Sequence, residues 1–160
     1  MSDTPRSILV LTVSDSIHAG EREDKAGTLA AAALVAHGWE VQRAQAPDEL
    51  DAIRAALEQY IGTVDVILTA GGTGLSSRDV TPDATAPLLE RLIPGIPDAI
   101  RMLGRSQTPA AILSRGVAGV LRGSVTRPCT HTGHCTHATQ TPAPPVPALP
   151  ARCLRPHPVC

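Results

Sequence analysis

The sequence predicts an α/β domain in which helices cover both faces of a mainly parallel central sheet, giving three α/β/α layers. Apolar runs at 7–14 and 64–68 have the length of buried strands. Helix-type patterns lie between the predicted strands, and such alternation favours a parallel sheet. The 160 residues are enough for one domain with a sizeable core.

Local patterns place the next elements of the first half. An alanine-rich helix at 28–37 should end where Gly38 follows it. Residues 39–46 alternate and are predicted to form a second strand, with Trp39, Val41 and Ala44 facing inward. A helix should open at Pro47 and Asp48, because apolar residues then recur at three- and four-residue spacing: Leu50, Ile53, Leu57, Tyr60 and Ile61.

Glycine and proline divide the second half of the chain. The strand at 64–68 runs into a glycine-rich loop, and a helix is expected at 84–92. Proline and glycine at 94–97 interrupt the chain before a short helix at 98–103. We expect a further strand at 110–113.

Composition excludes several classes of function. A net charge of −1 gives no broad attraction to nucleic acid, and Trp39 and Tyr60 alone offer few rings on which bases could stack. No apolar run reaches the roughly 18 residues of a membrane span, and the first residues show no signal-peptide pattern. We therefore expect a cytoplasmic protein that binds neither nucleic acid nor membrane.

The residues are distributed unevenly along the chain. All 15 acidic residues lie at or before Asp98, and all 4 cysteines lie after Arg127 together with histidines and many prolines. We expect 1–121 to form the domain and 122–160 to be a disordered tail, because this tail can bury little apolar surface. Its cysteines and histidines are zinc-type ligands, but their spacing fits no common zinc finger.

The stretch 69–85, TAGGTGLSSRDVTPDAT, carries the strongest signal for a binding site. Its glycines allow a sharp turn after a buried strand and a close approach to a ligand. Thr81 is predicted to cap a helix that has Pro82 in its first turn. A helix N-terminus beside a glycine-lined loop favours anions, so the stretch indicates a phosphate-bearing ligand.

Three aspartates follow the predicted strands. Asp15, Asp48 and Asp79 should gather at the carboxyl edge of the sheet, where ligands of such sheets bind. This arrangement suits Mg²⁺ shared with a phosphate. For Asp15 and Asp48 the alternative is a helix cap, which carboxylates at such positions often provide.

Arg78 and the glycines do not complete a known nucleotide motif. Arg78 could neutralise phosphate charge, or it could be a solvated surface arginine. The only lysine, Lys25, lies far from the glycines, so the loop is not a Walker A loop. GGTGLS also lacks the third glycine of GxGxxG, and a tight strand-to-helix turn would use the same residues.

The string GGTGLSSRDVTPDAT, together with LTVSDS, EDKAG, APDE and AILSRGVAGV, resembles the MogA/MoaB family of molybdenum cofactor biosynthesis, and more closely its MogA-type molybdopterin adenylyltransferases, over about residues 7–121. The resemblance implies a three-layer α/β domain, usually a homotrimer, related to the G domain of gephyrin. It also implies transfer of AMP from ATP to the molybdopterin phosphate with Mg²⁺, release of pyrophosphate, and hand-over to a MoeA-type metal-insertion protein.

The resemblance assigns roles to particular residues of this sequence. Asp48 and Asp79 fall on the family's two functionally important aspartates, which implies catalysis and Mg²⁺ binding. Further positions match the loop that lines the nucleotide and pterin phosphates, and the pocket edge: Gly71, Gly72, Thr73 and Gly74; Ser14, Asp15 and Asp24. With Arg78 and Thr81 of the glycine-rich stretch, they are the predicted substrate-binding residues.

The end of the chain departs from the family. Members continue after AILSRGVAGV with a strand, a Leu-Pro-Gly-x-Pro loop of the nucleotide pocket and a closing helix, none of which is recognisable here. We hypothesise a frameshift near codons 120–127, because one lysine among 14 basic residues indicates a GC-rich gene. Two alternatives to the enzyme are a non-catalytic molybdopterin-binding or scaffold module and a MoaB-type paralogue.

Overall fold

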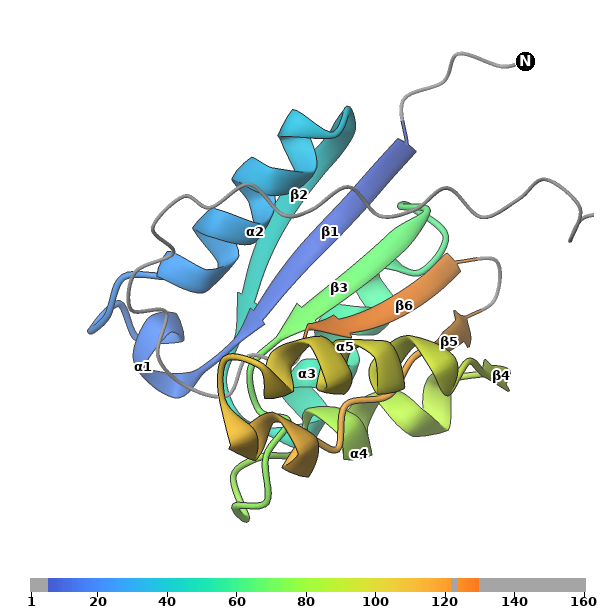
Figure 1. Cartoon of the computed structure of the whole chain (residues 1–160). Helices are drawn as coiled ribbons and strands as arrows, with labels where there is room; N and C mark the ends of the chain where they lie inside the picture. Colours follow the sequence, from blue (N-terminus) through green and yellow to red (C-terminus); the bar gives the residue numbers. More distant parts are fainter. Residues whose placement is uncertain (1–5, 122–123, 130–160) are drawn as a thin grey trace, which may run out of the picture.

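A six-stranded sheet forms the centre of the computed structural model (Figure 1), which describes residues 6–121 and 124–129. The strands lie in the order β2-β1-β3-β6-β5-β4. Parallel pairing joins the first four, and antiparallel pairing joins β6 to β5 and β5 to β4. Their bounds are β1 (Arg6–Val13), β2 (Trp39–Ala46), β3 (Val66–Ala70), β4 (Arg91–Leu92), β5 (Gly119–Leu121) and β6 (Ser124–Cys129).

Helices cover both faces of this sheet. Figure 1 shows α2 and α5 in front of the strands and α3 behind them. The mainly parallel, three-layer fold expected from the sequence is therefore confirmed. The helical segments are α1 (Asp15–His18), α2 (Lys25–Ala36), α3 (Leu50–Tyr60), α4 (Thr81–Thr85), η1 (Ala86–Leu88), α5 (Gly95–Arg105) and η2 (Pro109–Leu113).

The core explains why β1 is a continuous apolar run. β1 lies between β2 and β3, and residues 8–13 are all buried, so both of its faces are covered. Leu9 and Leu11 belong to the same buried cluster as Ile53 and Leu57 of α3. Each such side chain contributes about 1.5–3 kcal/mol to folding through burial. This packing holds the strand ends that carry the candidate site.

Strand register brings three loops together. Val13 pairs with Ala46 of β2, and Thr12 pairs with Ala70 of β3. The three strands therefore end at the same level. The segments that follow them, beginning at Ser14, Pro47 and Gly71, meet at the carboxyl edge of the sheet, as the sequence predicted.

Two sequence predictions in the second half are wrong. The helix expected at 84–92 begins at Thr81 and is short; it passes into η1 and then into β4. Pro87 lies in this segment, and proline cannot donate the backbone hydrogen bond that would continue an α-helix. The strand expected at 110–113 is the 3₁₀ helix η2, whose start at Pro109 suits a first helical position.

The sheet continues beyond residue 121. β6 lies within the segment that composition assigned to the tail, and its backbone pairs with β3 and β5. A strand thus follows β5, although the residues there do not show the strand that follows AILSRGVAGV in the family. Residues 122–123 and 130–160, with most of the zinc-type ligands, lie outside the described residues, so the domain boundary at 121 stays a prediction.

Within the described ranges, no helix is long and apolar enough to cross a membrane.

Candidate functional site

Asp15 and Asp48 bind each other's backbone at the ends of β1 and β2. The Asp48 amide donates to Asp15 Oδ1 at 2.9 Å, and the Asp15 amide donates to Asp48 Oδ2 at 3.0 Å. The N-cap residues of α1 and α3 are Ser14 and Glu49, and neither makes a side-chain capping bond. The helix-cap alternative for the two aspartates is therefore wrong, and the pair instead joins two loops of the site.

The glycine loop has a backbone shape that other residues would not tolerate. Gly71 and Gly72 have φ of +109° and +59°. A Cβ on Gly71 would lie 2.1 Å from the Val13 carbonyl oxygen. A Cβ on Gly72 would lie 2.4 Å from Thr81 Oγ1 and 3.3 Å from Asp48 Oδ1. The loop therefore passes directly against Asp48, as a close backbone approach requires.

Asp79 lies on the other side of the same loop. Its Oδ2 accepts a hydrogen bond from the Ser76 amide at 2.8 Å, and a Cβ on Gly74 would lie 2.8 Å from this oxygen. Burial raises the pKa of Asp48 above its ordinary value, and the charge of Asp79 raises it further. The glycine loop thus contacts both aspartates, Asp48 at Gly72 and Asp79 at Gly74.

This carboxylate pair fits Mg²⁺ by its chemistry. Mg²⁺ usually takes one or two protein carboxylates and completes its shell with water and substrate phosphate oxygens. Within residues 6–121 and 124–129, no three histidine, cysteine, aspartate or glutamate side chains converge on one metal position. Asp48 and Asp79 are two carboxylates of the kind that such a shared site uses, and metal binding by them stays a prediction.

Thr81 has a different place from the predicted one. It is the first residue of α4, and Val80 is the N-cap, so Thr81 does not cap this helix. The side chain is 1% exposed, and Oγ1 has no hydrogen-bond partner among the described residues. A buried hydroxyl without a partner costs about 1–3 kcal/mol, and this one lies against Gly72 of the glycine loop.

Arg78 is exposed and Ser14 is half-buried beside the site. Arg78 donates to Asp15 Oδ2 in an ion pair whose partners are 61% and 47% exposed. The guanidinium is therefore partnered rather than freely solvated, and it stays open to a ligand. The Ser14 hydroxyl lies 3.3 Å from the Ser16 hydroxyl. Thr73 is buried inside the loop.

Asp24 has a full set of partners. Its carboxylate accepts from the Thr12 hydroxyl at 2.8 Å, the Gly27 amide at 2.8 Å and Arg43 at 2.7 Å. Burial raises the pKa of Asp24, but the bonds from Gly27, Thr12 and Arg43 outweigh it and leave the pKa lowered. Asp24 is thus the N-cap of α2 and ties it to β1 and β2.

Arg115 is the site residue that sequence reasoning missed. Its guanidinium donates to the Gly74 and Asp79 carbonyl oxygens and to the Asp83 carboxylate. The hydrogen bond to Asp83 raises the pKa of Arg115 above its ordinary value. The motif AILSRGVAGV contains Arg115, but its contacts lie 32 to 41 residues away, so no local pattern indicates them.

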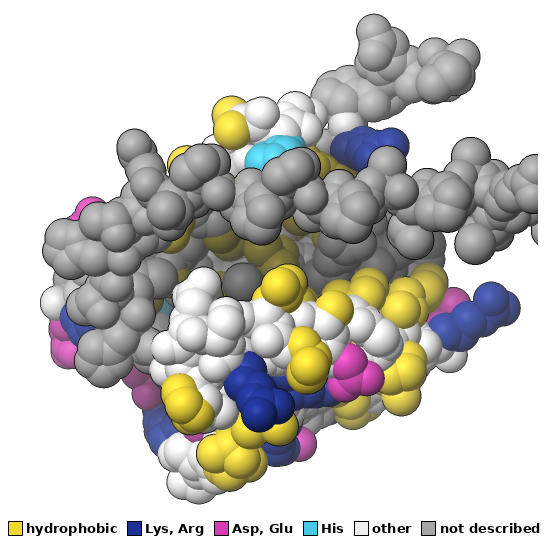
Figure 2. Space-filling view, in the orientation of Figure 1, with side chains coloured by type: hydrophobic (Ala, Val, Ile, Leu, Met, Phe, Trp, Pro, Cys, Tyr) yellow, Lys and Arg dark blue, Asp and Glu magenta, His cyan; other side chains and the backbone are white. Residues whose placement is uncertain are grey.

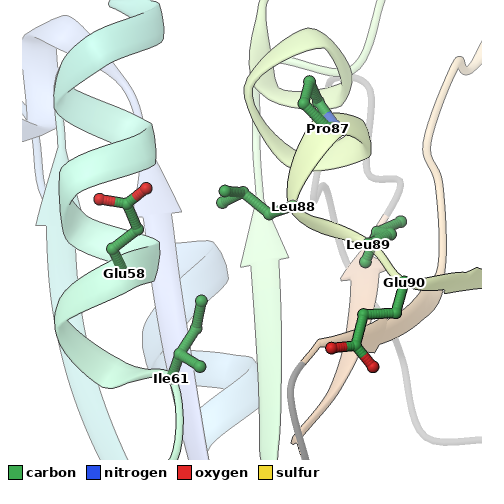
Figure 3. Close-up of a pocket in the computed structure, with 6 residues that line it drawn as sticks. All are labelled: Glu58, Ile61, Pro87, Leu88, Leu89 and Glu90. Carbon is green, nitrogen blue, oxygen red and sulfur yellow. The ribbon is translucent and has the colours of Figure 1, made fainter.

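Two pockets lie apart from the carboxylate pair. One of about 520 Å³ lies between α3 and the segment from η1 to β4 (Figure 3), and none of the predicted site residues lines it: Glu58, Ile61, Pro87, Leu88, Leu89 and Glu90. Another of about 500 Å³ is lined by His18, Arg43, Ala44 and Gln45. The carboxylate pair lines neither of them.

Comparison with known proteins was made on sequence and on structure. The family model described as "Probable molybdopterin binding domain" matches residues 9–140. A molybdenum cofactor biosynthesis bifunctional protein of Chlorobaculum tepidum is 38% identical over 118 residues, covering 72% of this chain and 38% of that protein. A molybdopterin adenylyltransferase of Pyrococcus furiosus is 34% identical over 116 residues, covering 71% of this chain and 68% of that protein.

Solved structures match the fold. The molybdopterin biosynthesis Mog protein from Mycobacterium ulcerans superposes with a TM-score of 0.72 and 34% identity, over 77% of this chain and 82% of that one. The molybdopterin biosynthesis enzyme MoaB from Thermus thermophilus superposes with a TM-score of 0.67 and 41% identity, over 78% and 82%. The chain therefore belongs to the MogA/MoaB family of molybdopterin-binding domains that serve molybdenum cofactor biosynthesis.

Proposed function

We propose that this chain is a molybdopterin adenylyltransferase that transfers AMP from ATP to the phosphate of molybdopterin. The observation that carries the proposal is that one glycine loop contacts both Asp48, at Gly72, and Asp79, at Gly74, with the unpartnered Thr81 hydroxyl beside Gly72. Relatives named molybdopterin adenylyltransferase support it.

The transfer step balances without a covalent enzyme intermediate. An oxygen of the molybdopterin phosphate attacks the α-phosphorus of ATP and forms a new P–O bond. The bond from the α-phosphorus to the oxygen that bridges it to the β-phosphate breaks, and pyrophosphate leaves with that electron pair. Catalysis of this kind depends on positioning and on electrostatic stabilisation.

The position of each site residue indicates its role in the transfer. Asp48 and Asp79 would hold Mg²⁺, which supplies positive charge against the phosphate oxygens when bound. Loop 71–74 lets the phosphates approach the backbone closely, and the Thr81 hydroxyl donates to a phosphate oxygen. Arg78 and Ser14 lie at the rim, where Arg78 adds positive charge. Asp15 fixes the backbone of Asp48.

A second candidate is a non-catalytic module that binds molybdopterin or a protein partner, and a MoaB-type paralogue belongs with it. The sequence after residue 121 favours this alternative, because it lacks the Leu-Pro-Gly-x-Pro loop that completes the nucleotide pocket in the family. The chain also spans 38% of the length of its Chlorobaculum tepidum relative, so that whole protein's activity does not transfer directly.

One incubation separates the two candidates. The full chain is mixed with molybdopterin, ATP and Mg²⁺, and adenylylated molybdopterin and pyrophosphate are measured together with molybdopterin binding. The adenylyltransferase forms both products in equal amounts. Tight molybdopterin binding without either product would overturn the proposal and identify the binding module.

We also propose that the chain forms a homotrimer and passes its product to a MoeA-type metal-insertion protein. Hydrophobic side chains lie exposed over the region of α5 and η2 (Figure 2): Met102, Leu103, Ile112 and Leu113, at 55% to 73% exposure. An exposed apolar patch often marks a protein interface. Light scattering should give three times the chain mass, and Met102→Glu should reduce that mass; a monomeric wild type would contradict the assembly.

A further inference from the structure

One arginine joins both halves of the glycine loop. The Arg115 amide donates to the Thr73 carbonyl oxygen at 2.9 Å. Its Nε donates to the Gly74 carbonyl oxygen at 2.9 Å, and an Nη donates to the Asp79 carbonyl oxygen. Gly74 and Asp79 are the two residues in contact at the loop's outer turn. Arg115 therefore fixes the backbone on both sides of the Asp79 carboxylate.

The same guanidinium is anchored to the helix that follows the loop. Its two terminal nitrogens donate to the two carboxylate oxygens of Asp83, at 3.1 and 3.0 Å. This paired geometry requires the planar guanidinium of arginine, because lysine carries a single ammonium group. Four of the five N–H donors of the Arg115 side chain bind groups of the glycine loop and of α4, so the contacts of this arginine hold the loop against the helix.

A second arginine holds the segment around Arg115. Arg101 of α5 donates through Nη1 to the Ser114 carbonyl oxygen at 3.0 Å and to the Gly116 carbonyl oxygen at 3.3 Å. Its other terminal nitrogen donates to Asp98 at 2.6 Å. The backbone on either side of Arg115 is therefore attached to α5.

We propose that Arg115 is a positioning residue that sets the place of the Asp79 carboxylate relative to Asp48, and that Arg101 supports it. Residues 71–80 contain neither helix nor strand, so regular secondary structure does not hold this loop. Arg115 supplies the missing restraint through the carbonyl oxygens of Gly74 and Asp79. The inference rests on the proposed function, since it assigns the restraint to a metal and phosphate site.

The decisive variant is Arg115→Lys, which keeps the charge but cannot make the paired and carbonyl contacts together. Arg105→Lys, an exposed position at the end of α5, is the matched control. With saturating substrates, Arg115→Lys should lower kcat by about 100-fold, because small misplacements of reacting groups cost about this factor. The KM for ATP should change by less than about 3-fold, since the four hydrogen bonds that hold the Arg115 side chain all lie within the protein.

Metal binding provides a readout that does not require turnover. Mn²⁺ is titrated into metal-free protein and followed by electron paramagnetic resonance. Arg115→Lys should weaken Mn²⁺ binding by about 10-fold, the lower end of the loss seen when a residue that orients a metal ligand is removed. Arg105→Lys should match the wild type, and the melting temperatures of all three proteins should agree within a few degrees.

The outcomes separate this inference from the proposed function. A wild type that binds Mn²⁺ without forming adenylylated molybdopterin would refute the function, and the Mn²⁺ comparison would still decide the role of Arg115. Equal Mn²⁺ affinity and equal kcat in Arg115→Lys and wild type would overturn the inference. A wild type that binds no Mn²⁺ would overturn the inference as well, because Asp48 and Asp79 would then not form a metal site.

Discussion

Replacing Asp24 with alanine tests whether this residue holds the fold rather than the substrate. The family resemblance places Asp24 at the pocket edge, whereas the structure buries it under three donors. Its side chain is 4% exposed, and the partners are the Thr12 hydroxyl, the Gly27 amide and Arg43. Asp24→Ala leaves all three donors without their acceptor.

The expected loss follows from those contacts. Removing a helix N-cap costs about 1 kcal/mol. The Gly27 bond is this cap, and the bonds from Thr12 and Arg43 also end on the charged carboxylate, where a hydrogen bond contributes about 1.5–3 kcal/mol. The Arg43 side chain is 41% exposed, so in the variant its guanidinium can bind water instead of Asp24, and its hydrogen bond counts at the low end of this range. Asp24→Ala should therefore lower the free energy of unfolding by about 4–5 kcal/mol, and Asp24→Asn, which keeps the cap acceptor, by about 1–2 kcal/mol.

Urea unfolding at pH 7, followed by circular dichroism, measures both losses. Asp51→Asn, on the exposed face of α3, is the control and should change stability by less than about 0.5 kcal/mol. If Asp24→Ala unfolds with less than about 1 kcal/mol of loss, the structural role assigned to Asp24 is wrong.

At low pH the Asp24 side chain should lose its stabilising effect on the fold, because the carboxylate becomes protonated. The folded-state pKa of Asp24 is lowered, so its stabilising contribution is present above the unfolded pKa of about 3.9 and is lost as pH falls through the folded value. The stability difference between wild type and Asp24→Asn should shrink below about pH 4. A difference that grows on acidification would contradict this assignment.

Two further predictions concern the glycine loop and Asp48. Gly72→Ala should cost about 1–3 kcal/mol of stability by urea unfolding, because φ is +59° and its Cβ would meet Thr81 Oγ1. Gly20→Ala is the control, because Gly20 has φ of +75° but no atom within 4 Å of an added Cβ, so it should lose only the stability that a positive φ costs alanine. Equal losses of stability in the two variants would show that the Cβ at position 72 does not clash with Thr81. Burial and Asp79 raise the folded pKa of Asp48, so its contribution to stability is full below about pH 3.9 and is lost as pH rises through the folded value. Asp48→Asn, unfolded in urea with a chelator present, should therefore lose less stability between pH 4 and 7 than wild type, and a steeper loss would refute the raised pKa.

The sequence predicted the frame of the site because its signals are local. β1 and β2 appear as an apolar run and an alternating run, and they end where the pattern ends. Positive φ at Gly71 and Gly72 follows from glycines placed directly after a strand. Asp15, Asp48 and the loop gather because parallel strands in register end at one edge.

Features that depend on distant contacts were missed. Arg115 binds carbonyl oxygens, which every loop presents, so residue types alone do not reveal its partners. The four apolar residues 110–113 are compatible with either a strand or a short helix. They form a 3₁₀ helix, and Pro109 favours it because proline suits a first helical position. The pairing of the β6 backbone with β3 and β5 is likewise not visible in its residue types, and the domain boundary that composition places at 121 stays a prediction.

Asp24 shows a local signal that was present but given another meaning. It directly precedes the helix from Lys25 to Ala36, which is an ordinary N-cap position for aspartate. The family resemblance instead implies a place at the pocket edge. The bonds to Thr12 and Arg43 add a structural reason for aspartate that only the fold reveals.

The rate of pyrophosphate release from ATP, with molybdopterin and Mg²⁺ present, most directly tests the assignment of the chemistry to the Asp48 and Asp79 pair. We expect Asp79→Asn to lower this rate at least about 100-fold, a loss typical of removing one preorganised charge-stabilising group, while melting within a few degrees of wild type. Asp51→Asn should retain the full rate. Unchanged turnover in a folded Asp79→Asn variant would remove Asp79 from the mechanism and contradict the proposed site.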